Sequence, residues 1–141
     1  MTIYLGADHA GYELKEQVKK YLEEKGLKSV DLGTFNLNNV DYPDIAREVA
    51  EKVLENHGAK GILMCGSGQG MCMTANKMPG IRAALCEDAE LAKLARAHND
   101  ANILCFGARR LSFDQAKEII DVFLNTDFEG GRHEARVKKV G

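Results

Sequence analysis

The sequence predicts an α/β fold: a three-layer Rossmann-like sandwich around a five-stranded parallel sheet, followed by a C-terminal basic tail segment. Two observations predict it. Short apolar runs rich in β-branched residues alternate with longer amphipathic stretches, and glycines follow several of these segments. Strands that alternate with helices at this period are parallel and joined by right-handed crossovers, which place helices on both faces of the sheet. The 141 residues have no internal repeat or linker and are expected to form a single domain, 1–141.

Each predicted element follows from its own pattern. The predicted strands are residues 3–5, 28–32, 61–65, 81–86 and 103–106. The predicted helices are residues 12–25, 71–78, 88–97 and 113–124, with one more that opens at Tyr42 and is closed by Gly58. In the first helix Leu14, Val18 and Leu22 recur at helical spacing. Gly26 stands where a helix is expected to end in a glycine.

Composition excludes several classes of partner. The 19 Lys and Arg residues nearly balance the 21 Asp and Glu residues, which gives a net charge of −2. No basic field is available for nucleic acid and no polybasic stretch for a membrane surface, and no apolar run is long enough to span a membrane. We therefore expect neither partner, and any anion site must be local.

Cysteine usage and the N-terminus suggest a location. The residues MTIYLGADHAG lack the basic flank and apolar run of a signal peptide. The four cysteines at positions 65, 72, 86 and 105 form no CxxC pair. We expect a cytoplasmic protein with reduced thiols and no cysteine-bound metal.

The segment after the third predicted strand is the first candidate site, because open α/β sheets bind ligands beyond the carboxyl ends of their strands. Three glycines in Gly66–Gly70 allow backbone N–H groups to form an anion-binding nest. The spacing is neither GxxxxGK[ST] nor GxGxxG, so the nest suits a small anion or an oxyanion. Cys65 lies at its mouth, near a helix N-terminus that favours a thiolate. The alternative is a small buried residue that ends a strand.

Two polar segments contain further candidates. Asp8 stands where a helix N-cap belongs, and His9 beside it could bind an anion or be a partly exposed histidine. The run His98-Asn99-Asp100-Ala101-Asn102 groups donors and acceptors before the fifth strand. His98 could instead only complement the dipole of the preceding helix.

Four arginines complete the set. Arg109 and Arg110 follow the fifth strand. Arg132 and Arg136 are four residues apart, so on a helix both could reach one phosphate, although a solvated basic tail is the alternative. We expect the nest, the thiol, the two histidines and the arginines to lie at one edge of the sheet.

The ordered set of motifs resembles the ribose-5-phosphate isomerase B family, which also includes the galactose-6-phosphate isomerase subunits. The motifs are GADHAG, DYPDIA, CGSGQG, ANK with GIRAAL, HNDAN, FGARR and FEGGRHEARV, and they span essentially the whole chain. The resemblance implies an aldose–ketose isomerase without a cofactor or metal. It also implies a homodimer or homotetramer with active sites built from two subunits.

The resemblance assigns roles by position. It implies that Cys65 is the catalytic base and that His98 donates a proton in opening the sugar ring. The substrate-binding positions that it implies are Asp8, His9, Gly66, Ser67, Gly68, Gln69, Gly70, Asn99, Arg109, Arg132 and Arg136. One branch of the family carries a glutamate base just after the glycine loop. Here that position is Met71, so Cys65 is the only base candidate in the loop.

The expected reaction interconverts ribose 5-phosphate and ribulose 5-phosphate through an enediolate. Cys65 would move the proton between C2 and C1, while N–H groups of the nest stabilise the developing oxyanion. One alternative is an isomerase of another sugar phosphate, such as allose 6-phosphate or galactose 6-phosphate. The other is a sugar-phosphate-binding module without activity, which would need the nest and arginines but no thiol.

Overall fold

The computed structural model describes residues 1–141, which form five strands and six helices. The elements in chain order are β1 (Thr2–Ala7), α1 (Tyr12–Glu24), β2 (Lys28–Asp31), α2 (Tyr42–Glu55), β3 (Lys60–Cys65), α3 (Gln69–Ala75), β4 (Ala83–Leu85), α4 (Ala89–Asn99), β5 (Ile103–Gly107), α5 (Phe113–Asn125) and α6 (Arg132–Val140). No helix is both long enough and apolar enough to span a membrane.

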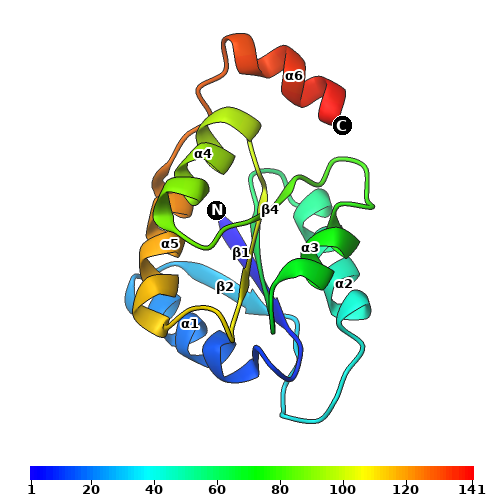
Figure 1. Cartoon of the computed structure of the whole chain (residues 1–141), viewed down its shortest axis with the longest axis vertical. Helices are drawn as coiled ribbons and strands as arrows, with labels where there is room; N and C mark the ends of the chain where they lie inside the picture. Colours follow the sequence, from blue (N-terminus) through cyan, green and yellow to red (C-terminus); the bar gives the residue numbers. More distant parts are fainter.

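The five strands form one parallel sheet in the order β2-β1-β3-β5-β4. Helices α1, α4 and α5 pack on one face, and α2 and α3 pack on the other (Figure 1). The predicted three-layer α/β fold is therefore confirmed. The central strands β1, β3 and β5 are almost wholly buried and apolar, as parallel strands covered on both faces must be.

Several predicted boundaries shift. Helix α3 begins at Gln69, two residues early, because Gly68 adopts the left-handed conformation that ends the loop. Strand β4 has three residues where six were predicted, since it is an edge strand that pairs with β5 alone. Helix α2 ends at Glu55, before Gly58. Helix α1 ends as expected: Gly26 has φ 72° and its N–H donates to the Glu23 carbonyl at 3.0 Å.

The basic tail forms a helix, as the spacing of Arg132 and Arg136 required for both to reach one phosphate. Helix α6 has nine residues and buries none of them. It lies beyond the last turn of α4, at the end of the molecule where the C-terminus is marked (Figure 1). An Nη1 group of Arg82 donates to the carbonyl of Gly141 at 3.1 Å, which ties the end of α6 to the segment before β4.

A buried ion pair fixes the loop that follows β2. The side chain of Lys15 is fully buried in α1 and pairs with Asp31, whose side chain is 6% exposed. The other oxygen of Asp31 accepts the N–H of Gly33 at 2.9 Å. Gly33 and Thr34 then exchange backbone hydrogen bonds with Ala7, both at 2.7 Å. This network holds the loop against the carboxyl end of β1, one residue before Asp8.

Replacing Lys15 by Met should lower the free energy of unfolding by about 3 kcal/mol, because Asp31 is left buried without its main counter-charge. Lys19, whose Nζ lies 3.4 Å from the same carboxylate, keeps the loss at the lower end of the usual range. The matched control is Lys52→Met, which breaks an exposed pair with Glu55 and should cost less than about 1 kcal/mol. Urea unfolding measures both, and equal losses would contradict the assignment.

Candidate active site

Cys65 is the last residue of strand β3 and lies at the mouth of the glycine loop. Gly68 has φ 83°, and a Cβ there would lie 2.7 Å from the carbonyl carbon of Phe106 and from Leu85 Cδ1. Only glycine therefore fits, and the chain turns tightly enough for the Gly68 N–H to donate to Cys65 Sγ at 3.2 Å. The loop thus places a backbone N–H donor directly on the thiol that lies at its mouth.

The loop also presents free donors. The backbone N–H groups of Gly66, Ser67 and Gly70 have no backbone partner in the protein. The same residues line a cavity of about 480 Å³ at the carboxyl ends of β1, β3 and β5. The full lining is Asp8, Tyr42, Cys65, Gly66, Ser67, Gly70, Arg109 and Arg110. A thiol, free N–H donors and guanidinium groups therefore face one space.

Asp8 has a different structural role from the one predicted. The N-cap of α1 is Gly11, so the N-cap interpretation of Asp8 is wrong. Instead Oδ1 of Asp8 accepts the N–H groups of Ala10 and Gly11 at 3.0 and 3.1 Å, within the four residues that separate the end of β1 from the start of α1. Its carboxylate is held rigidly at the cavity wall. Nδ1 of His9 is buried and has no hydrogen-bond partner.

The two arginines after β5 differ in their pairing. Arg110 is held by Glu87, with Nε 3.0 Å from the carboxylate. Arg109 takes part in no ion pair, and its guanidinium lies over Gly66, where a Cβ would be 3.2 Å from Nη1. Arg109 is therefore the cation of this cavity that is free to bind an anion.

The remaining predicted residues lie at the opposite edge of the sheet, where the parallel strands begin. Helix α4 runs antiparallel to the strands, so its last turn, with His98 and Asn99, comes before the amino end of β5. Helix α6, with Arg132 and Arg136, lies at the same end (Figure 1). The five residues of β5 separate the two edges by about 13 Å. The expectation that one chain gathers every site residue at one edge is therefore wrong.

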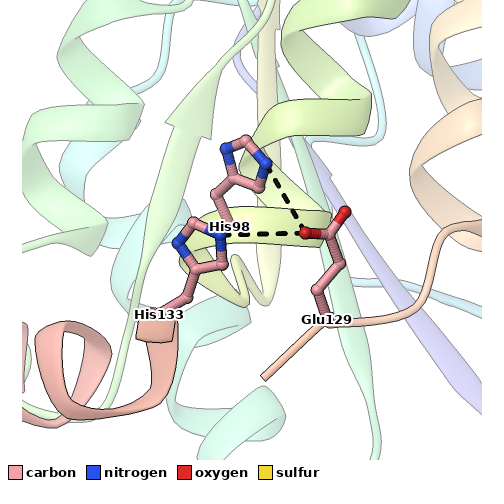
Figure 2. A group of neighbouring side chains, drawn as sticks. All are labelled: His98, Glu129 and His133. Carbon is pink, nitrogen blue, oxygen red and sulfur yellow. Dashed lines mark ion pairs between the residues drawn. The ribbon is translucent and has the colours of Figure 1, made fainter. Parts of the chain in front are cut away.

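His98 has two close neighbours at that edge (Figure 2). Its ring stacks on that of His133, with centroids 4.3 Å apart and planes 13° from parallel. Nε2 of each histidine lies 3.7 Å from the same carboxylate oxygen of Glu129. Burial, and then the charges of His98 and Arg132, lower the pKa of His133 below its usual value. Arg132 and Arg136 themselves take part in no ion pair, in contrast to Lys138, which pairs with Glu134.

Comparison with known protein families shows which family the chain belongs to. Residues 3–140 match the model of the family described as Ribose/Galactose Isomerase. The chain belongs to the ribose/galactose isomerase family. In this member of the family, Cys65 with its glycine loop lies at one edge of the sheet and His98 lies at the other.

Relatives within the family agree over nearly the full length. The protein of Escherichia coli K12 named ribose-5-phosphate isomerase B is 42% identical over 138 residues, which cover 98% of this chain and 93% of that protein. The structure of Clostridium thermocellum ribose-5-phosphate isomerase B is 45% identical, with a TM-score of 0.98 over 100% of this chain and 95% of that one. The structure of ribose-5-phosphate isomerase B from Mycoplasma genitalium with bound ribulose-5-phosphate is 43% identical, with a TM-score of 0.95 over 99% and 93% of the two chains.

Sequence reasoning missed two groups that this isomerase fold brings into contact with predicted site residues. Tyr42 lines the cavity and its ring lies against Gly70, where a Cβ would be 2.5 Å away. The sequence indicated Tyr42 only as a helix start. Glu129 and His133 contact His98. Their spacing of four residues was the signal in the sequence that could have paired them with each other. Their contact with His98 also requires α6 to dock on α4, which the sequence did not show.

The cysteines should differ sharply in reactivity. Burial raises the pKa of the Cys86 thiol to about 12 and that of Cys105 well above its usual value. At neutral pH only about one Cys86 in 10⁵ is a thiolate. Iodoacetamide followed by peptide mapping should therefore label Cys86 and Cys105 only after denaturation, whereas Cys65, which lines the cavity, should be labelled in the folded protein. Labelling of Cys86 or Cys105 as fast as Cys65 would contradict this ordering.

Proposed function

We propose that this chain is a ribose-5-phosphate isomerase that interconverts ribose 5-phosphate and ribulose 5-phosphate, with Cys65 as the general base. The observation that carries the proposal is the Cys65 thiol, held by the Gly68 N–H in a cavity with free donors and an unpaired arginine. Membership of the isomerase family supports it, as does the ribulose-5-phosphate bound to the Mycoplasma genitalium relative. The proposal includes one domain over residues 1–141 and the cytoplasm as the location.

The reaction needs only proton transfers. His98, with Asp8, opens the furanose by moving a proton from the anomeric hydroxyl to the ring oxygen. The Cys65 thiolate then removes the proton from C2. The C–H electron pair forms the C1=C2 bond, and the carbonyl pair moves to the oxygen on C1. The Cys65 thiol returns its proton to C1, the oxygen on C2 becomes the carbonyl, and its former hydroxyl proton passes to the oxygen on C1.

The glycine loop and the arginines supply binding and charge stabilisation. Free N–H groups of the loop can bind the developing enediolate oxygens, and one such donor is worth roughly 10²–10³ in rate. His9, Arg109, Arg132 and Arg136 would hold the phosphate, with Asn99, Ser67 and Gln69 beside the sugar. This positions C1 and C2 over the Cys65 sulfur.

A complete site then requires two copies of the chain. Within one chain the Cys65 cavity and the His98 edge are separated by the height of the sheet. A homodimer, alone or within a homotetramer, could place the His98 edge of one copy over the Cys65 cavity of the other. Symmetry would then create two such sites in each dimer.

The substitution Cys65→Ala should reduce kcat for ribose 5-phosphate below a tenth of its original value, because the base acts in the transition state, and should remove deuterium exchange at C2. The matched control Cys72→Ala, on the following helix, should keep its activity. A Cys65→Ala protein that retains more than about a tenth of kcat would show that Cys65 is not the base. No ketose from the original protein with ribose 5-phosphate, allose 6-phosphate or galactose 6-phosphate would favour the binding module.

Mixing inactive variants tests the shared site. Cys65→Ala and His98→Asn should each be inactive alone. Where the site is shared, half of the mixed dimers are hybrids and each hybrid has one intact site, so about a quarter of the original activity should return. A Cys65→Ala and Cys65→Ser mixture is the control, since no hybrid site in it holds a thiol. A mixture that stays inactive after subunit exchange has been verified would place both residues in one chain's site.

A further inference from the structure

We propose that His98, Glu129 and His133 form a binding site for a divalent transition metal such as Zn²⁺, and that metal bound there inhibits the isomerase. The three side chains lie together (Figure 2). Within one chain they are at the edge of the sheet opposite Cys65. The inhibition, but not the binding, rests on the function proposed above.

The three ligand atoms already lie close together. One nitrogen of each histidine and one oxygen of Glu129 lie within 4.8 Å of one another. The distance from Glu129 to each histidine Nε2 is 3.7 Å. In a tetrahedral zinc site with bonds of about 2.0–2.1 Å, the ligand atoms lie roughly 3.4 Å apart. Each histidine–carboxylate distance therefore needs to shorten by only a few tenths of an ångström.

The backbone that carries these side chains is held without a metal. The N–H of Glu129 donates to the carbonyl of Ala97 at 3.0 Å, which fixes the segment before α6 beside the last turn of α4. Nε of Arg96 donates to the carbonyl of Thr126 at 3.1 Å and adds a second anchor. Glu129 and His133 are then adjacent through their spacing of four residues. Nε2 of each histidine lies 3.7 Å from one oxygen of Glu129, and because the two rings are nearly parallel, one ring must turn out of the stack before both nitrogens point at one metal.

The side chains can complete the coordination by rotation. The side chains of His98 and Glu129 are 37% and 58% exposed, so both can turn at small cost. His133 is only 12% exposed and provides the fixed ligand. A metal between the three atoms would replace these histidine–carboxylate contacts with coordinate bonds.

The donor set selects the class of metal. Two imidazoles and one carboxylate leave a fourth position open, as in catalytic zinc sites. Imidazole also suits copper and nickel, whereas Mg²⁺ and Ca²⁺ prefer oxygen ligands alone. The charges of Arg132 and Arg136 oppose a cation, so affinity should be below that of a structural zinc site.

A metal bound at this site would interfere directly with the proposed reaction. Coordination uses the lone pair of a His98 ring nitrogen, and a ring bound to metal through that atom cannot exchange a proton there. Ring opening of the closed sugar would then stop. The metal is therefore an inhibitor here and has no part in the chemical step at Cys65.

Zinc titration of the whole protein, followed by competition with a chromogenic indicator, measures the binding without any substrate. We expect one Zn²⁺ per chain and at least a tenfold loss of affinity in both Glu129→Gln and His133→Asn, because losing a ligand costs no less than losing an outer-shell partner. His57→Asn, at an exposed histidine after α2, is the matched control and should keep the original affinity. Unchanged affinity in both ligand variants would overturn the site.

Cys65 is the competing ligand, because thiolates also bind zinc. The Cys65→Ser protein should keep the zinc affinity, and Co²⁺ bound to the original protein should show no thiolate charge-transfer band. Loss of binding in Cys65→Ser alone would assign the metal to the thiol and overturn the proposal. In the isomerase assay, activity should fall as the site fills and return on adding a chelator. Full activity at full occupancy would overturn the inhibition and leave the binding result standing on its own.

Discussion

The common direction of the five strands is the constraint on which the rest of the structure depends. Because all strands are parallel, their carboxyl ends meet at one edge, and the segments after β1, β3 and β5 form one cavity there. For the same reason every crossover helix returns to the other edge, and α4 carries His98 with it. A single parallel sheet therefore divides the candidate residues of this isomerase into two groups. The proposed pairing of two copies is a consequence of that geometry.

Local sequence patterns predicted the parts of the fold and site that depend on neighbouring residues. The strand–glycine–helix segment from β3 to α3 could be predicted, because buried apolar residues and closely spaced glycines determine it within a dozen positions. The wrong expectation that all site residues lie at one edge of the sheet was avoidable. A helix that connects two parallel strands must end at the edge where the strands begin, and His98 is at the end of such a helix. The place of Tyr42 was not predictable, because it depends on how the loop before α2 packs against the carboxyl end of β1. The contact of His98 with His133 depends likewise on the docking of α6.

Stability and site geometry are linked through a few residues that serve both. The buried Lys15–Asp31 pair holds the loop after β2 against Ala7, and so fixes the approach to Asp8 and the start of α2. Gly68 is required twice, once for its positive φ and once because Phe106 and Leu85 leave no room for a Cβ. Groups that the site needs free are left free: Arg109, Arg132 and Arg136 have no carboxylate partner, while Arg110 has one.

These unpaired cations give the proposed assembly a thermodynamic consequence. Arg109 lies at one edge of the sheet and Arg132 and Arg136 lie at the other, so neither edge alone holds the full set of cations for a phosphate. With the site shared between copies, a bound sugar phosphate contacts both copies and stabilises their association. Linkage then makes the effect reciprocal, since whatever strengthens the pairing of copies strengthens substrate binding by the same free energy. At a substrate concentration of about 100 times its dissociation constant, each complete site would add about 2.7 kcal/mol to the stability of the pair. In such a dimer, assembly and catalysis depend on the same arginines.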